Sequence, residues 1–510
     1  MSSKRNLEKI LSVSDDELFL QLIWSLNAIQ TNRASKARRN LNFPSAAATT
    51  DPLSTHAIRI WELETLANLA LTIKKDKKRI RRGISFNHQE FESAATVVNI
   101  LRSIESREFL EYQDNIHILK EMHRILQRQL QWQRGFTNTQ ELYRSAFIYG
   151  QEECAEFFNQ AYGISIQDFT FIGYAMFCCL RGQSSAPFFL PKGFGISPEV
   201  YRQAMMRLSK PIEEARKEAQ VELNFAKEKL GSVPIAFRPS FFRRFPIITF
   251  GNWKPICRSP LPDLIIYRIT SGLYYDTTQG GSKLINLAAD RFEEYSLKIT
   301  RTLLSKFDVS PSKKYAYKKN IVETPDIIVK TNDKLEFIIE CKSAKLSYAA
   351  QFSSNPLEDA AQQYEQLAKG IQQIWRFSSH LRCGYIKDIA FDELIYGMVL
   401  TNDNWIEVSG DIRDDVFELA NSIASEDEIL EKNRCGIVFC HIREYEQFLM
   451  SYNEQEVRSI ISTYIEKSYP GWALTKAAED AGFSPSKVKS YPFDVNDVLP
   501  WWNQLDELKG

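Results

Sequence analysis

The sequence has few of the residues that mark zinc-binding, secreted or membrane-spanning proteins. Its eight cysteines form no Cys-x-x-Cys pair, which argues against a structural zinc site and against a disulfide framework. The first residues do not resemble a signal peptide, and the most apolar run, residues 169–180, is too short to cross a bilayer. No P-loop is present, so ATP-driven translocation would need a separate partner. We therefore expect a soluble, cytoplasmic protein with reduced thiols and no membrane partner.

An excess of charge of either sign is also missing. The 64 basic residues balance 64 acidic residues, and the 44% hydrophobic content is ordinary for a globular chain. A balanced total neither supports nor excludes a polyanionic partner, because local patches decide that. The strongest basic run, residues 74–82, is interpreted as a solvated helix end in preference to a phosphate-binding patch.

The hydrophobic pattern predicts three regions. Residues 1–232 show apolar positions at helical spacing, which predicts a large, mainly α-helical domain. We assign this domain no catalytic role and regard target selection, sensing or assembly as its candidate functions. Residues 233–450 open with β-like segments (245–250, 253–257 and 264–274) and continue as an α/β domain. Residues 451–510 are expected to form a small helical region, in which 475–491 resembles either a DNA-reading helix-turn-helix or an ordinary two-helix corner.

Within the second region the predicted order is helix, strand, strand, strand, helix, strand, helix, strand. This order indicates an α/β mixed sheet flanked by helices. The expected segments are a helix at 284–304, a strand at 315–321, two strands at 326–342, a helix at 357–377, a strand at 393–400, a helix at 415–424 and a strand at 436–441.

Residues 324–342 carry the chemistry. Two short apolar strands flank the polar turn 330–334; Asp326 opens the first strand, and Glu340 and Lys342 close the second. Strand alternation places Glu340 and Lys342 on one face, and pairing through the turn brings Asp326 to the same end. Two carboxylates and the main-chain carbonyl of Cys341 offer hard oxygen ligands to Mg²⁺. The alternative is a salt bridge of Lys342 with Asp326 or Glu340 and no catalysis.

These residues resemble the PD-(D/E)xK nuclease superfamily, which has the restriction-endonuclease-like fold. Pro325-Asp326 corresponds to its Pro-Asp, and Glu340-Cys341-Lys342 to its Glu-x-Lys. The family also carries an acidic residue on the helix before the sheet, for which we choose Glu293 with Glu294 as the second choice. Its following helix carries a polar residue, for which Gln362 and Gln363 remain open.

The resemblance implies a Mg²⁺-dependent endonuclease, with Mn²⁺ as a substitute metal, that cleaves DNA. It further implies Asp326, Glu340, Lys342 and Glu293 as catalytic residues, and it suggests restriction or anti-phage defence as the biological setting. A homo-oligomer or a companion defence protein is an expected partner. Two alternatives stay open: a nuclease acting on RNA, and a non-catalytic nucleic-acid-binding or assembly protein on the same fold.

Overall fold

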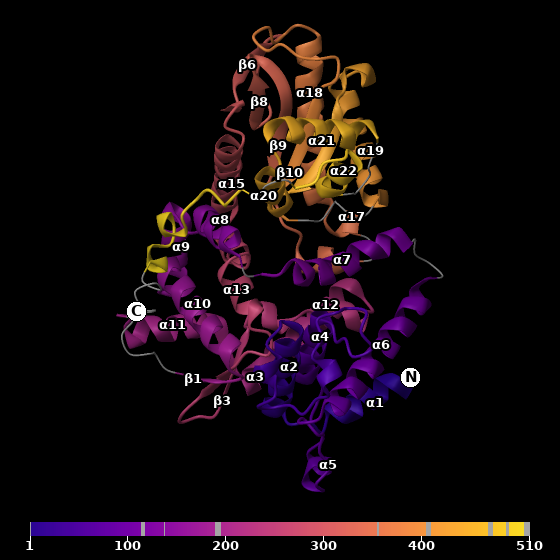
Figure 1. The fold of residues 1–510 in the computed structure, drawn as a ribbon, viewed down its shortest axis with the longest axis vertical. Helices are drawn as coiled ribbons and strands as arrows, with labels where there is room; N and C mark the ends of the chain where they lie inside the picture. Colours follow the sequence, from indigo (N-terminus) through magenta and orange to yellow (C-terminus); the bar gives the residue numbers. More distant parts are fainter. Residues whose placement is uncertain are drawn as a thin grey trace. The chain divides into compact units, whose positions relative to one another are not determined.

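The computed structural model describes residues 2–113, 118–136, 138–188, 195–353, 356–403, 410–467, 473–485 and 489–503 (Figure 1). The chain divides into two compact units, one of residues 1–116, 128–281 and 495–510, the other of residues 117–127 and 282–494. Helix α7 (Ile118–Arg134) therefore contributes its first part to the second unit and its last turns to the first.

The first unit is mainly helical, as the pattern of residues 1–232 predicts. The Asp15 side chain caps α2 by accepting a hydrogen bond from the main-chain N–H of Leu18. The helices are α1 (Ser2–Leu11), α2 (Asp16–Gln30), α3 (Ala34–Ala37), α4 (Ile60–Thr72), α5 (Lys77–Arg81), α6 (Phe91–Gln113), α8 (Thr139–Tyr149), α9 (Glu152–Tyr162), α10 (Ile166–Gly182), α11 (Pro198–Leu208), α12 (Ile212–Leu230), α13 (Asp263–Ile269) and α14 (Leu273–Thr278). Short 3₁₀ helices are η1 (Ser45–Ala47), η2 (Ile235–Phe237), η3 (Phe241–Arg243), η5 (Val495–Asp497) and η6 (Pro500–Trp502).

Buried ion pairs tie distant segments of this unit together. The guanidinium of Arg243 pairs with the buried carboxylate of Glu64 at 2.8 Å, and the indole Nε1 of Trp132 donates to the same carboxylate at 2.7 Å. Because a buried charge is costly without partners, these contacts fix η3 and α7 against α4.

A small sheet also belongs to the first unit. It has the order β1-β4-β3-β2 and joins β1 (Ala186–Pro187), β2 (Ser209–Pro211), β3 (Ile247–Phe250) and β4 (Ile256–Arg258). Since β3 and β4 pair with strands from residues 186–211, the β-rich segment after residue 232 lies with the first unit. The expected boundary at 232 is thus replaced by a division after Gly281.

The prediction of a β-like segment at residues 264–274 is wrong. This segment forms helices α13 and α14. All residues of α13 from Leu264 to Ile269 are buried, so the helix has no polar face and its sequence lacks the helical period. Pro262 and Asp263 stand at its start, where proline and an acidic residue suit a helix N-terminus.

The second unit has mixed α/β structure. A mixed sheet has the order β11-β10-β9-β8-β5, in which β9, β10 and β11 are parallel and β8 is antiparallel to both of its neighbours. Its strands are β5 (Asp308–Pro311), β8 (Ile327–Thr331), β9 (Lys334–Lys342), β10 (Tyr396–Thr401) and β11 (Gly436–His441), and a separate ribbon is formed by β6 (Lys314–Tyr317) and β7 (Asn320–Glu323). Its helices are α15 (Ser282–Leu303), α16 (Tyr348–Phe352), α17 (Pro356–Asp359), α18 (Ala361–Arg382), α19 (Gly410–Glu426), α20 (Ile442–Ser451), α21 (Glu454–Glu466) and α22 (Leu474–Asp480), with the 3₁₀ helix η4 (Glu431–Asn433).

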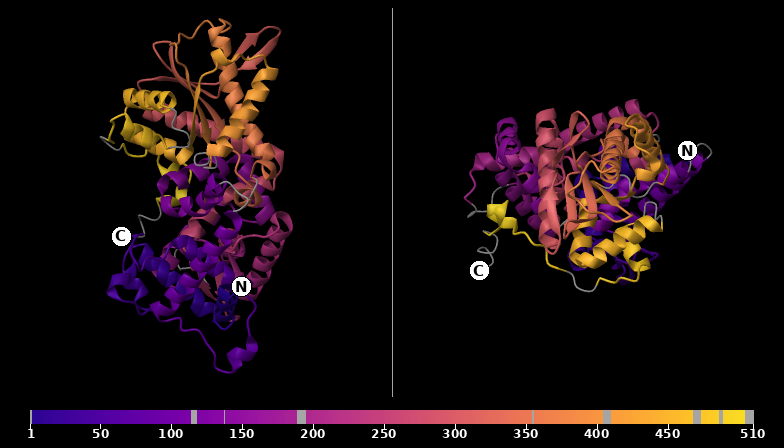
Figure 2. Two further views of the ribbon diagram at one scale, coloured as in Figure 1. Left: turned by 90° about the vertical axis from the view of Figure 1, so that its right-hand side faces the viewer. Right: turned by 90° about the horizontal axis from the view of Figure 1, so that it is seen from above.

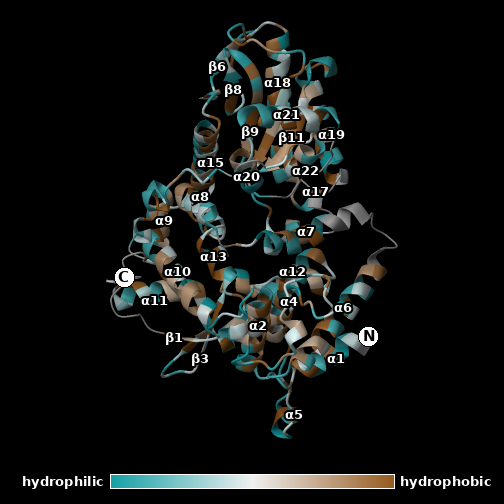
Figure 3. Cartoon of the chain, in the orientation of Figure 1, coloured by the Kyte–Doolittle hydropathy of each residue, from teal (hydrophilic) through white to brown (hydrophobic). Residues whose placement is uncertain are grey.

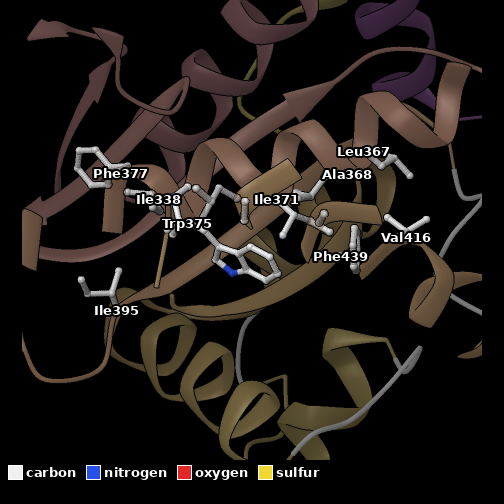
Figure 4. Close-up of a cluster of buried hydrophobic side chains, with 14 of the residues drawn as sticks. Ile338, Leu367, Ala368, Ile371, Trp375, Phe377, Ile395, Val416 and Phe439 are labelled. Atoms are coloured by element: carbon white, nitrogen blue, oxygen red, sulfur yellow. The ribbon is translucent and has the colours of Figure 1, made fainter. Parts of the chain in front are cut away.

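Helices cover both faces of this sheet (Figure 2). On one face α18 and α19 pack over β9, β10 and β11; on the other face lie α15, α20 and α21. The strands are apolar on both sides, as Figure 3 shows for β9 and β11, because both faces are covered. The α18 face encloses a cluster of buried side chains that includes Ile338, Ile371, Trp375, Val416 and Phe439 (Figure 4).

The hairpin of β8 and β9 turns at Asn332 and Asp333, whose φ angles are 49° and 63°. Asn and Asp tolerate this left-handed conformation better than other non-glycine residues, so the polar turn expected from the sequence is suited to its backbone. The strand expected at 315–321 is instead the two-stranded ribbon of β6 and β7, because Lys318, with a φ of 52°, reverses the chain in its middle.

The region 451–510 does not form one body. Helices α21 and α22 lie with the second unit, whereas residues 495–503 return to the first. There the Trp501 indole Nε1 donates to Thr170 Oγ1 at 3.1 Å, and its ring contacts Phe171 and Tyr174.

In the part of the chain that the structure describes, no single helix is both long and apolar enough to cross a membrane. The bent pair of α9 and α10 passes that test when the two helices are taken together.

Candidate active site

The structure brings Asp326, Glu340 and Lys342 to one end of the sheet. Asp326 directly precedes β8, and Glu340 and Lys342 end β9. The antiparallel register pairs Ile327 with Ile339, which sets Asp326 level with Glu340. Ile338 lies in the cluster under α18, so Glu340 and Lys342 share its face, as strand alternation predicts.

These side chains contact one another directly. Lys342 Nζ pairs with Glu340 Oε1 at 2.7 Å, and Asp326 Oδ2 accepts a hydrogen bond from the main-chain N–H of Cys341 at 2.7 Å. The Glu340 side chain is 2% exposed and that of Lys342 is 16% exposed. The salt bridge expected as the alternative to catalysis is therefore present, with Glu340 as the partner.

A glutamine that the sequence did not single out completes the contacts of Lys342. Gln373 on α18 accepts a hydrogen bond from Lys342 Nζ at 3.1 Å. Of the two glutamines considered, Gln362 is exposed and Gln363 half-buried, and neither makes this contact among the described residues. The sequence signal that could have pointed to Gln373 is Gly370, one turn before it. A Cβ at Gly370 would lie 2.9 Å from Lys342 Cε, so the backbone of α18 passes close to Lys342 there.

Glu293 reaches the same site from α15. Its carboxylate interacts electrostatically with Asp326, Glu340 and Lys342, whereas the adjacent Glu294 is exposed. Of the two neighbouring acids, the structure therefore places Glu293 beside the strand ends.

Burial and mutual repulsion disfavour the charged forms of these acids. Burial, together with the charges of Asp326 and Glu340, raises the pKa of Glu293 to about 8. Burial raises the pKa of Glu340 to about 7, although Lys342 acts in the opposite direction. Burial also raises the pKa of Asp326, despite the hydrogen bond from Cys341. Burial opposes the charge on Lys342, but Glu340 and Asp326 outweigh it and raise its pKa. The site is thus rich in acid, and Lys342 is a positive charge that acts on all three carboxyl groups.

One carboxylate oxygen at this site lacks a partner. Glu340 Oε2 is buried and has no hydrogen bond of ordinary geometry among the described residues. The nearby main-chain N–H of Asp326 nevertheless lowers the pKa of Glu340 and so favours its charged form. Within the same residues, no group of three or more His, Cys, Asp or Glu side chains is arranged to hold a metal ion. The site therefore offers an unsatisfied carboxyl oxygen, and its described side chains form no closed ligand shell.

Two other candidate regions differ in their exposure. In the basic run, Lys75 pairs with Asp16 at 2.8 Å and Asp76 caps α5, whereas Lys74, Lys77, Lys78, Arg81 and Arg82 are exposed. In the possible helix-turn-helix, Lys487 lies outside the described residues. Lys489 donates to the main-chain carbonyls of Leu303, Leu449 and Tyr452. Tyr491 shares a hydrogen bond with Tyr295. Lys489 and Tyr491 are half-buried and make these contacts within the protein, which disfavours the DNA-reading alternative for this region.

Comparisons of the chain with protein-family models, with curated proteins and with solved structures found no match.

Proposed function

We propose that the chain is a Mg²⁺-dependent nuclease of the PD-(D/E)xK type that hydrolyses phosphodiester bonds in DNA. The observation that carries this proposal is the meeting of Asp326, Glu340 and Lys342 at the ends of β8 and β9, with Glu293 beside them. Acids whose pKa values are raised by burial and by one another are typical of functional sites. A restriction or anti-phage role is proposed from the family resemblance.

The arrangement of the second unit supports the restriction-endonuclease-like fold. An acid-bearing helix, α15, precedes the hairpin of β8 and β9, and the long helix α18 and the parallel strands β10 and β11 follow. The site lies where two neighbouring strands present their ends on one face, next to a helix that packs closely enough to contact Lys342.

The donor atoms fit Mg²⁺. Asp326 and Glu340 supply carboxylate oxygens, one of them buried without a partner. Cys341 donates its main-chain N–H to Asp326, and in a strand the N–H and C=O of one residue face the same neighbour, so the Cys341 carbonyl is directed to the same side. Two carboxylates and a carbonyl suffice for Mg²⁺, because this ion keeps several of its waters and needs no closed protein shell. When bound, the ion would neutralise charge on the scissile phosphate and lower the pKa of a water.

The residues of the chain then have distinct tasks. Lys342 supplies the positive charge beside the reacting phosphate, where it orients the attacking water or stabilises the charge of the transition state. Gln373 positions its ammonium group through the 3.1 Å hydrogen bond. Glu293 brings a further carboxyl group to the site on the α15 side, and a bound cation would favour its charged form by offsetting the repulsion from Asp326 and Glu340.

The test is a plasmid-nicking assay with Mg²⁺ and with EDTA. We expect cleavage only with Mg²⁺, and its loss in Lys342→Ala and Glu340→Ala. Glu293→Gln and Glu294→Gln form a matched pair of neighbouring residues on α15: the first should lower the cleavage rate and the second should leave it unchanged. Full activity of Lys342→Ala would refute the assignment. The same assay on RNA substrates decides whether the chain cleaves DNA or RNA.

One observation favours a second function, that of a non-catalytic nucleic-acid-binding or assembly protein. Lys342 and Glu340 already form a close ion pair, which satisfies the lysine without a substrate. Salt-sensitive DNA binding that survives Asp326→Asn, with no cleavage by the unaltered chain under any divalent ion, would establish this function instead.

A further inference from the structure

The ribbon of β6 and β7 carries a concentration of positive charge that the proposed site does not use. Lys313, Lys314, Lys318 and Lys319 are all exposed. The acids near them are also exposed: Lys314 lies 3.9 Å from Glu323, and Lys318 lies 3.8 Å from Glu428. Exposed pairs at such separations contribute little, so the ribbon keeps its positive potential.

The inward face of the ribbon is fixed to α18. The Tyr317 ring stacks on the His380 ring with centroids 3.7 Å apart and an interplanar angle of 22°. The Tyr315 hydroxyl shares a hydrogen bond with His380 Nδ1 at 2.9 Å. Alternation therefore turns Lys314 and Ala316 outward while both tyrosines face the helix. The lysines are therefore exposed on a β-ribbon that packs against α18.

The base of the ribbon leads directly into the proposed site. Lys313 and Thr324 close it with two hydrogen bonds, and Asp326 follows two residues later. The main-chain oxygen of Glu323 lies 3.5 Å from the Arg376 guanidinium, one turn along α18 from Gln373. The charged ribbon and the acidic cluster are therefore neighbours on the α18 side of the same unit.

The turn of the ribbon is not optimised for stability. Lys318 has a φ of 52°, a conformation that glycine or asparagine adopts at lower cost than lysine. A lysine here gives up some local stability and adds charge at the tip, next to Lys319.

We propose that this ribbon binds the phosphate backbone of the DNA on which the site acts, a role that rests on the proposed nuclease function. Lysine ammonium groups bind phosphate as point charges and read no sequence, so the ribbon positions the duplex without selecting its target. A two-stranded ribbon also matches the width of a DNA major groove. The four lysines then contribute to affinity mainly through the release of counterions from DNA.

The experiment measures binding of a short labelled DNA duplex by fluorescence anisotropy in EDTA, over a series of salt concentrations, with the full chain. The ribbon variant carries Lys313→Gln, Lys314→Gln, Lys318→Asn and Lys319→Gln; asparagine keeps the left-handed turn favourable. The control variant removes equal charge from exposed lysines elsewhere in the same unit, at Lys283, Lys387, Lys432 and Lys467. A third variant places arginine at the four ribbon positions and retains the charge.

Each phosphate that the protein no longer neutralises should make the slope of log K against log salt concentration shallower by about 0.9, so the slope of the ribbon variant should be shallower by about two to four. The arginine variant should keep the slope of the unaltered chain, and the control variant should nearly keep it. A ribbon variant that matches the control overturns the proposal, even if the unaltered chain cleaves DNA. If the ribbon lysines contribute to DNA binding but the unaltered chain cleaves no DNA with Mg²⁺, the binding role of the ribbon is supported and the nuclease function is refuted.

Discussion

Gly370→Ala should separate catalysis from folding. A Cβ at this position would lie 2.9 Å from Lys342 Cε and 3.5 Å from Glu340 Cγ. Since carbon atoms in contact prefer about 3.5–4.0 Å, Lys342 must retreat by up to about 1 Å. That shift weakens its 2.7 Å contact with Glu340 and its 3.1 Å contact with Gln373. A displacement of this size in a catalytic group costs about a hundredfold in rate.

Stability should change little in the same variant. Alanine gains about 1 kcal/mol over glycine inside a helix, and the weakened charge-assisted hydrogen bonds cost about the same or slightly more. We expect the free energy of unfolding to stay within about 1 kcal/mol of the unaltered chain. The rate is measured by plasmid nicking with Mg²⁺, and stability by urea denaturation.

Gly410→Ala is the control, because a Cβ there meets none of the described residues within 4 Å. It should leave both the rate and the stability close to those of the unaltered chain. An unchanged nicking rate in folded Gly370→Ala would show that the position of Lys342 does not limit the reaction, and the reasoning from the close approach of α18 would fail.

Three further predictions concern pH, a buried ion pair and the site glutamine. Because the pKa of Glu340 is about 7, its carboxylate is mostly protonated at pH 6, and Mg²⁺ affinity measured by titration calorimetry should rise about tenfold from pH 6 to pH 9. Without Mg²⁺ the sign reverses for stability: the folded chain binds more protons than the unfolded chain between pH 4.5 and about 7, so thermal stability should fall as pH rises through that window. Arg243→Met should cost about 3–5 kcal/mol in urea denaturation by leaving the Glu64 charge buried, and adding Glu64→Gln should recover most of it. Gln373→Leu should lower the nicking rate while the exposed Gln362→Leu does not.

The parts of the fold that the sequence predicts well have strong local signals. The hairpin of β8 and β9 combines two apolar runs with an Asn-Asp turn, and α15 has a clear helical period, so both lie where the pattern places them. The site residues on the hairpin can also be predicted from the sequence, because strand alternation and antiparallel pairing determine which side chains lie together.

The remaining features depend on packing that no local pattern encodes. The sequence around Gln373 also holds Gln362 and Gln363, and only the rotation of α18 against β9 selects the residue that reaches Lys342. The helix α13 is buried on all sides and so carries no amphipathic period. The contact of Trp501 with Thr170 joins residues 331 positions apart.

That pairing of Trp501 with Thr170 has a consequence for biosynthesis. Residues 495–503 complete the first unit, yet they are translated after the whole of the sheet-bearing unit that interrupts it. Thr170 and Phe171 on α10 therefore cannot make these contacts until Trp501 has been synthesised, long after α10 itself. A single proteolytic cut after Gly281 would leave the two units joined through the chain at residues 116–117, 127–128 and 494–495.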